Sequence, residues 1–238
     1  MINLNYKSKK LLLLQRNELL SDRQRFLRKK FGRFVFTNFL INFFQKKNIE
    51  NIAEELFQNE IEIIKNFLPY KAENIMDVGC GLGIINIFLN QIYENKVNFY
   101  LLDKNQINKK IKYGYSYNYE SYNKLDETKK LLLNNGLDNK SINIYDVDKE
   151  FFINKKIDLV ISLKSMCYHY PIDIYLKLFS SCCDNDTTFI FDVTEGLFSE
   201  NLFKNYFEEV NIIYEEKSIH SLIRLCCKKF KLINDNIG

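Results

Sequence analysis

Residues 74–89 read NIMDVGCGLGIINIFL, and this stretch has the residue types and spacing best suited to binding a ligand. A short apolar run around Asp77 is followed by Gly79, Gly81 and Gly83 at alternate positions, and then by apolar residues at helical spacing. This order predicts a strand, a tight turn and a helix. Glycine adopts positive φ angles and lets a ligand approach where a Cβ atom would collide with it. We therefore expect the turn to bind a ligand through its main-chain amides, assisted by the N-terminal end of the helix.

The spacing of the glycines distinguishes between two classes of cofactor. A dinucleotide fingerprint is G-x-G-x-x-G, and its third glycine would fall at Ile84. The observed D-x-G-x-G-x-G pattern instead resembles the first motif of the class I S-adenosylmethionine-dependent methyltransferases. That resemblance implies S-adenosyl-L-methionine as the cofactor. The residues of this turn that it assigns to cofactor binding are Asp77, Gly79, Cys80, Gly81 and Gly83.

Two further predicted strands also end in carboxylates. Asp103 ends the strand at 96–103, 20 residues past the last glycine of the turn, where this type of sheet presents a carboxylate to a ribose diol. The next strand, SINIYDVD, ends at Asp146 and its neighbours. By the resemblance, Asp146 accepts a hydrogen bond from the adenine amine and Val147 packs on the ring, with Asp148 as the competing assignment for the amine contact.

The segment after the most apolar strand, residues 157–165, holds the candidate catalytic groups, because residues past the carboxyl end of a central strand face the ligand crevice. His169 is the candidate base, since an imidazole accepts a proton near neutral pH. The alternative is a histidine that only hydrogen-bonds the loop. Lys164 either orients the acceptor or binds an anionic group on it. The remaining assignments here are Ser162 to the cofactor, and Ser165 and Tyr170 to the acceptor.

A tyrosine-rich segment at 104–123 interrupts the alternation of strands and helices. Alternate tyrosines along an extended segment line one side of it and suit stacking on sugars or bases. Tyr113 and Tyr115 are accordingly assigned to the acceptor. The alternative is a hairpin or flap that packs on the domain.

The residues after the central strand also restrict the acceptor. Methyltransferases that act on exocyclic amines of bases usually have an N/D-P-P-Y/F turn here, whereas this chain has S-L-K-S at 162–165. The S-L-K-S-M-C-Y-H-Y-P run resembles uncharacterised methyltransferases labelled as sugar O-methyltransferases. The leading hypothesis is therefore O-methylation of a small hydroxylated acceptor such as a sugar. The alternatives are an RNA-directed methyltransferase and a non-catalytic scaffold with a methyltransferase fold.

The predicted elements define the fold class. Five strand–helix units precede two alternating strands, at 206–214 and 218–228, that form a hairpin. This order resembles the class I methyltransferase fold over residues 60–230, and implies an α/β protein with a seven-stranded, mostly parallel, doubly wound sheet. Residues 1–60 are predicted to form a basic, aromatic helical extension or lid, and residues 61–238 the Rossmann-like methyltransferase domain.

Charge is concentrated near the N-terminus. Residues 1–47 contain 12 Lys and Arg against 2 Asp and Glu, whereas the whole chain has a net charge of +4. Paired apolar residues at 12–13, 19–20 and 26–27 predict one stripe of an amphipathic helix. A capping box at Ser21 and Gln24 would instead split this run into two helices. Three interpretations of the basic face are open: a solvated surface, a binding surface for nucleic acid, or a contact with a membrane surface.

Composition excludes several other classes. With 46% hydrophobic and 15% aromatic residues, the chain is predicted to be globular. It has no apolar run of the roughly 18 residues that span a bilayer, and no signal peptide, so a cytoplasmic protein is expected. Six cysteines without a C-x-x-C pair and only two histidines predict no metal site. The sequence does not indicate an oligomeric state.

Overall fold

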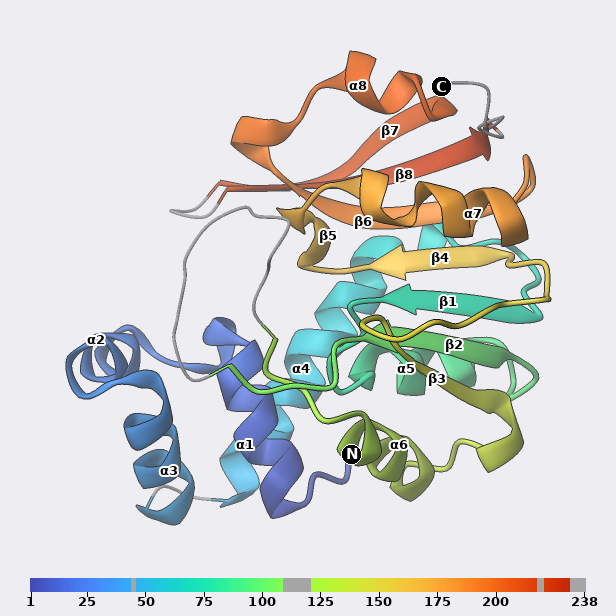
Figure 1. The fold of residues 1–238 in the computed structure, drawn as a ribbon. Helices are drawn as coiled ribbons and strands as arrows, with labels where there is room; N and C mark the ends of the chain where they lie inside the picture. Colours follow the sequence, from blue (N-terminus) through green and yellow to red (C-terminus); the bar gives the residue numbers. More distant parts are fainter. Residues whose placement is uncertain (44–45, 109–120, 218–220, 232–238) are drawn as a thin grey trace.

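A seven-stranded sheet forms the centre of the protein (Figure 1). The computed structural model describes residues 1–43, 46–108, 121–217 and 221–231. The strand order is β3-β2-β1-β4-β6-β8-β7. Neighbours from β3 to β6 pair in parallel, and β8 pairs antiparallel with both β6 and β7. The strands are β1 (Asn74–Val78), β2 (Asn98–Asp103), β3 (Ile142–Asp146), β4 (Leu159–Ser162), β6 (Thr188–Thr194), β7 (Phe207–Glu216) and β8 (Leu222–Phe230). The predicted seven-stranded, mostly parallel sheet is confirmed.

Each face of the sheet is covered by its own hydrophobic core, because side chains alternate along the strands. On β1, Ile75 belongs to one core and Met76 to the other. The first core is completed by α1 (Tyr6–Gln15), α4 (Lys46–Ile64), α5 (Ile84–Ile92) and α6 (Leu125–Asn134). The second is an aromatic core with α7 (Leu176–Cys182) and α8 (Glu200–Lys204). The sheet is therefore covered on both faces, as the doubly wound class requires.

Two local predictions are wrong. Residues 147–158, which connect β3 to β4, contain neither a helix nor a strand, so the expected five strand–helix units are one helix short. The segment after β4 is a further short strand, β5 (Ser165–Tyr170), packed beside β6 rather than a loop. It bends at Cys167, which has a φ of +63°, and this left-handed residue interrupts the alternation that would have predicted a strand.

In the described part of the chain before β1, the α-helices are four in number (Figure 1). The capping box is present, with the Ser21 hydroxyl accepting from the Gln24 amide, so the single-helix prediction is wrong and the split is confirmed. Because α2 (Asp22–Phe31) starts anew at the cap, the predicted stripe ends there. Leu19 and Leu20 are buried, whereas Phe26 is 67% exposed. The helix α3 (Arg33–Phe43) completes the set. The proposed domain boundary at residue 60 falls inside α4 and stays a prediction.

Within the described ranges, every helix is too short or too polar to cross a bilayer.

Candidate functional site

The glycine turn between β1 and α5 has the predicted backbone conformation. Gly79, Gly81 and Gly83 have φ angles of +71°, +55° and +69°. All three amides donate within the protein. Those of Gly79 and Gly83 bond main-chain carbonyl oxygens at 2.7 and 2.8 Å, and that of Gly81 bonds the Asp103 carboxylate at 2.8 Å. In this conformation the three amides are therefore engaged within the protein, and ligand binding by the turn stays a prediction.

Two side chains cover the turn. A Cβ atom placed on Gly79 would lie 1.7 Å from Oγ of Ser165, at the start of β5. One placed on Gly81 would lie 2.9 Å from Oε1 of Gln15, at the end of α1. Nε2 of Gln15 in turn donates to the carbonyl oxygen of Tyr122 at 2.8 Å. A ligand that reaches the main chain of Gly81 must therefore displace the Gln15 side chain.

Asp103, at the end of β2, is held against the turn. Its carboxylate accepts from the amides of Gly81 at 2.8 Å and Lys104 at 2.7 Å, and from Nδ2 of Asn123 at 3.1 Å. Burial raises the pKa of Asp103 to about 6, against the lowering effect of these hydrogen bonds. The residue is thus a carboxylate at neutral pH, at the position where the sequence places a ribose ligand.

Asp77 is the most deeply buried acid of the site. Its carboxylate accepts from Nδ2 of Asn86 at 2.6 Å, which ties β1 to the first turn of α5. Burial raises the pKa of Asp77 to about 7, and the nearby Asp103 carboxylate adds to this, against the hydrogen bond from Asn86. The oxygen of the Asn86 amide is buried and has no hydrogen-bond partner among the described residues.

The raised pKa of Asp77 predicts a pH-dependent stability. Between its usual pKa of about 4 and its folded pKa of about 7, the folded state holds a proton that the unfolded state releases. This contribution to stability is complete below about pH 4 and is lost as the pH rises through about 7. Asp77→Asn, which stays neutral, is expected to remove this decline. Urea unfolding of both proteins at several pH values measures it, and parallel pH profiles would contradict the assignment.

Asp146 lies beside Asp103 at the same edge of the sheet, since the two residues are partners in the β2–β3 register. Its carboxylate accepts weakly from the amide of Asn105 at 3.4 Å and lies 3.8 Å from Nζ of Lys149. A cavity of about 460 Å³ adjoins it, a size typical of ligand sites. The lining residues include Asn105, Asp126, Lys129, Tyr145, Asp146, Lys149 and Phe151. Val147, which the resemblance assigns to the adenine ring, donates its amide to the carbonyl of Asp103 at 3.1 Å, and Asp148, the competing residue for the amine contact, is exposed.

The polar residues at the end of β4 and after it lie in different surroundings. Ser162 is buried, and its hydroxyl donates to the Val78 carbonyl at 2.7 Å. Ser165 lies against the glycine turn, with its hydroxyl 2.8 Å from that of Tyr170. Lys164 points elsewhere, because its ammonium pairs with Glu18 of the N-terminal segment. The structure therefore brings Ser165 and Tyr170 to the turn, but not the ammonium of Lys164.

His169 lies on β5, with its ring edge-on to that of Tyr168 at 4.8 Å between centroids. The residue is exposed, yet the atoms around the imidazole remove part of its water. This desolvation, together with the cations Arg33 and Arg16, lowers the pKa of His169 to about 4. The ring is therefore neutral at pH 7, but it is a weaker base than an ordinary histidine, because a general base works best when its pKa lies near the working pH. Its role as a base stays a prediction, and Tyr113 and Tyr115 lie outside the described residues.

Sequence reasoning missed the residues that pack on the turn from other elements. Asn123 donates to both the carbonyl of Gly81 at 2.6 Å and the Asp103 carboxylate, and the Thr128 hydroxyl donates to the same carbonyl at 2.8 Å. Asn123 lies just before α6, and Thr128 lies in its first turn. Gln15 had no signal, since a glutamine at the end of an apolar helix is ordinary.

A buried ion network supports the site from the other side. The Arg224 guanidinium on β8 makes two hydrogen bonds to Asp192 on β6, at 2.6 and 3.0 Å, and pairs with Glu60 on α4. Asp192 also accepts the amide of Lys164 at 2.9 Å. The three ion-pairing residues are each buried, so the network joins a helix and two strands to the segment that follows β4.

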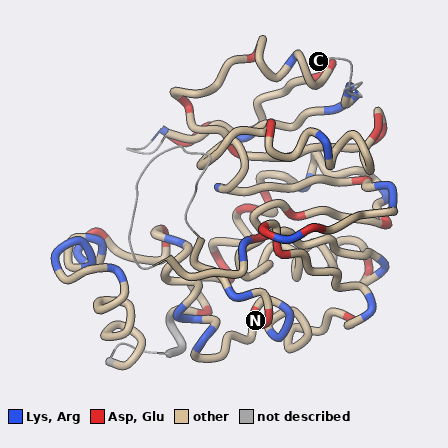
Figure 2. Tube along the Cα trace, viewed as in Figure 1, with Lys and Arg blue, Asp and Glu red and all other residues tan. Residues whose placement is uncertain are grey.

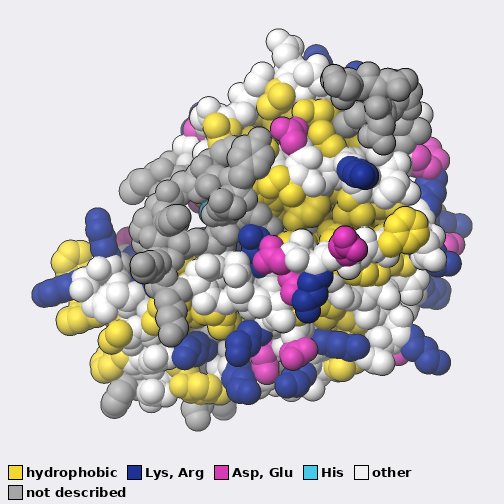
Figure 3. Space-filling model, viewed as in Figure 1, with side chains coloured by type: hydrophobic (Ala, Val, Ile, Leu, Met, Phe, Trp, Pro, Cys, Tyr) yellow, Lys and Arg dark blue, Asp and Glu magenta, His cyan; other side chains and the backbone are white. Residues whose placement is uncertain are grey.

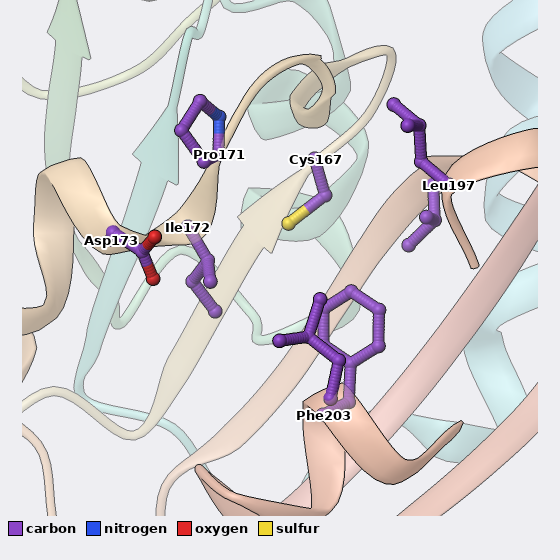
Figure 4. Close-up of a pocket in the computed structure, with 8 residues that line it drawn as sticks. Cys167, Pro171, Ile172, Asp173, Leu197 and Phe203 are labelled. Carbon is purple, nitrogen blue, oxygen red and sulfur yellow. The ribbon is translucent and has the colours of Figure 1, made fainter. Parts of the chain in front are cut away.

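A second cavity lies between β5, β6 and the segment leading to α8, where Cys167 points toward Phe203 (Figure 4). Its volume of about 50 Å³ holds little more than a water molecule. Its one acidic lining residue, Asp173, accepts from the Tyr206 hydroxyl at 2.8 Å. This cavity is too small for a cofactor. In the parts of the chain that the structure describes, no cluster of three His, Cys, Asp or Glu residues is arranged for a metal ion.

No protein-family model matches the chain, and no curated protein sequence does either. Solved structures do match. A segment named StiE O-MT, residues 961–1257, superposes with a TM-score of 0.52 at 14% identity, over 80% of this chain and 80% of that one. A proposed O-methyltransferase of Nostoc punctiforme PCC 73102 also gives a TM-score of 0.52, at 10% identity, over 76% of this chain and 58% of that one.

At these identities the likeness concerns the fold. Together with the strand order and the antiparallel hairpin, it shows that the chain has the class I methyltransferase fold that the glycine motif predicted.

Proposed function

We propose that this chain is an S-adenosylmethionine-dependent methyltransferase that methylates a hydroxyl oxygen of a small acceptor such as a sugar. The observation that supports it most is the Asp103 carboxylate, hydrogen-bonded to the amide of Gly81 and in register with Asp146. This places a glycine turn and two acids side by side at one edge of a methyltransferase-fold sheet. The two solved structures described above are named as O-methyltransferases, which favours an oxygen acceptor.

The residues present fit the proposed cofactor. Gly79 and Gly81 have no Cβ atoms, so a ligand could pack directly on the main chain once the side chains of Ser165 and Gln15, which lie against the two glycines, move aside. Asp103 would hold the ribose, and Asp146 the adenine at the adjoining cavity of about 460 Å³. Asp77, Cys80, Gly83, Val147 and Ser162 would shape the site around them. When bound, the cofactor supplies an electrophilic methyl group.

The protein would supply position and a proton acceptor. A hydroxyl is a poor nucleophile unless a base takes its proton during attack, and we assign this role to His169. Ser165, Tyr170, Tyr113 and Tyr115 would orient the acceptor. Lys164 would act through its ion pair with Glu18 rather than by touching the acceptor. Because most of the rate gain comes from holding the reacting atoms in line, these positioning contacts matter as much as the base.

Removal of the Gln15 side chain is expected to tighten cofactor binding. Gln15→Ala opens the space in front of Gly81 and forgoes the hydrogen bond to the Tyr122 carbonyl, which a ligand must break in any case. One such bond is worth about 1 kcal/mol, or roughly a fivefold increase in affinity. Calorimetric titration with S-adenosylhomocysteine measures it. Weaker binding by Gln15→Ala would mean that Gln15 holds the cofactor.

Substitution of the candidate base gives the activity test. His169→Gln is expected to lower the rate of methyl transfer by roughly 100-fold or more, while S-adenosylhomocysteine affinity stays unchanged. The assay follows transfer of a labelled methyl group to a panel of mono- and oligosaccharides, with RNA as the competing acceptor. Labelled RNA with unlabelled sugars would favour the alternative, and unchanged transfer by His169→Gln would remove His169 as the base.

The RNA-directed alternative receives less support because part of the N-terminal basic charge is already engaged. Lys9 pairs with Glu50 at 3.1 Å, and the buried Arg28 guanidinium donates to the carbonyl of Leu13 at 2.8 Å. We further propose that residues 1–60 act as the lid of the site, since Gln15 already lies on the glycine turn. A cytoplasmic location remains part of the proposal.

A further inference from the structure

The helices α2 and α3 project from the body of the protein and expose apolar side chains (Figures 1 and 3). Phe26 and Val35 are 67% and 66% exposed, and Phe31 is 56% exposed. Leu27 is exposed as well. We call these four residues the α2–α3 apolar set. Large apolar side chains at such exposure, grouped on one short helical pair, are typical of an interaction surface rather than of ordinary surface scatter.

The same helices carry accessible positive charge (Figure 2). Residues 21–39 contain six Lys and Arg and one acidic residue. Arg28 is buried against α1, and the Arg33 guanidinium lies 4.8 Å from the ring centroid of Tyr122. The four others are exposed, namely Arg23, Arg25, Lys29 and Lys30. At 100° per residue, Arg23, Lys29 and Lys30 lie within about 60° of Phe26 around α2, whereas Arg25 lies nearer to the side of Arg28.

An exposed aromatic residue ringed by long basic side chains matches the surface of an anionic bilayer. Phenylalanine and aliphatic side chains insert at the boundary of headgroups and acyl chains, while Lys and Arg stay at the phosphate level. Each basic residue near such a surface adds attraction to anionic lipid. An anionic lipid surface therefore accounts for both the exposed apolar side chains and the exposed basic side chains of α2–α3.

Other partners fit less well. Nucleic acid would use the basic residues, but Leu27 and Val35 have no ring to stack on a base. A second copy of the chain would cover the apolar set only by bringing two strongly basic surfaces together, which like-charge repulsion opposes. We propose that α2–α3 docks the protein on an anionic lipid surface. The docking does not depend on the proposed methyltransferase activity.

Sedimentation with lipid vesicles tests the docking on the full chain. We expect binding to vesicles with about one third phosphatidylserine and none to pure phosphatidylcholine, because the basic side chains are attracted only to anionic lipid. The double substitution Phe26→Ser with Phe31→Ser keeps the charge and is expected to weaken binding more than roughly tenfold. The pair Lys29→Glu and Lys30→Glu keeps the apolar set and is expected to weaken binding at least roughly tenfold, with a smaller salt dependence.

Controls separate this surface from unspecific effects. Ile212→Ser removes an exposed apolar side chain on β7, and Lys155→Glu reverses an exposed charge far from α2 in the sequence; both are expected to bind vesicles as the wild type does. Unfolding midpoints confirm that each variant folds. Equal binding to both vesicle types, or no effect of Phe26→Ser with Phe31→Ser, overturns the proposal. RNA binding without vesicle binding assigns the surface to nucleic acid, and a dimer lost in the same variant assigns it to a second copy.

Discussion

Replacing Gly79 with alanine is expected to weaken binding of S-adenosylhomocysteine severely. The new Cβ atom would lie 1.7 Å from Oγ of Ser165, and Ser165 is itself held by the Tyr170 hydroxyl at 2.8 Å. The backbone φ of +71° adds about 1–2 kcal/mol of strain for any residue with a Cβ atom. Either the turn or the start of β5 must move, so we expect affinity to fall by roughly 100-fold or more. Calorimetric titration and thermal unfolding together measure the effect.

Gly136→Ala is the matched control, because Gly136 also has a positive φ of +89°, but a Cβ atom added there would have no neighbouring atom within 4 Å. It is expected to lose about 1 kcal/mol of stability and to bind S-adenosylhomocysteine normally. Adding Ser165→Gly to Gly79→Ala removes the collision and should restore part of the binding. Wild-type affinity in Gly79→Ala alone would show that this contact does not shape the cofactor site.

Replacing Arg224 with methionine is expected to cost the protein about 3–5 kcal/mol of unfolding free energy, because it leaves buried carboxylates without their cation. Asp192 and Glu60 are both buried and both pair with this guanidinium. Asp192 also bonds the amide of Lys164, so the start of the segment after β4 should loosen. Urea unfolding measures the loss, and hydrogen exchange at residues 164–170 measures the loosening.

The control is an ion pair at the surface. Lys156→Met removes contacts to Asp184 at 2.7 Å and Asp186 at 3.2 Å, and is expected to cost less than about 1 kcal/mol because those side chains are solvated. A triple variant that replaces Arg224, Asp192 and Glu60 with apolar residues should recover stability relative to Arg224→Met. Equal costs for Arg224→Met and Lys156→Met would contradict the structural role of the network.

The sheet was predictable because its central strands are buried on both faces. Residues 75–78 and 159–162 are apolar except for Asp77 and Ser162, and all of them are buried, as in parallel strands between helix layers. The glycine turn was predicted from the alternate spacing of its glycines, and Asp103 from its distance of 20 residues past the last of them. The structure places them in direct contact, through the hydrogen bond between the Gly81 amide and the Asp103 carboxylate.

The contacts between distant segments were not predictable. Gln15 reaches Gly81 only because α1 packs over the site, and no local pattern indicates where a helix before the sheet will lie. Arg224 and Glu60 are ordinary charged residues in sequence and meet only in the folded core. The strand β5 was read as a loop because the left-handed Cys167 breaks its pattern. The connection after β3 lacks a helix because residues 147–158 have no apolar helical period.

The central claim is that the glycine turn and Asp103 bind the cofactor, and titration with S-adenosylhomocysteine tests it most directly. The wild-type chain is predicted to bind it saturably, and Asp103→Asn, which loses a charge-assisted acceptor, to bind at least roughly tenfold more weakly. Asp103→Asn also removes an acceptor from the donors of Gly81, Lys104 and Asn123, so it is expected to unfold at a lower temperature, and the titration is made below both unfolding transitions. Absence of binding to the wild type, or equal affinity in the two proteins, would contradict the assignment of this site.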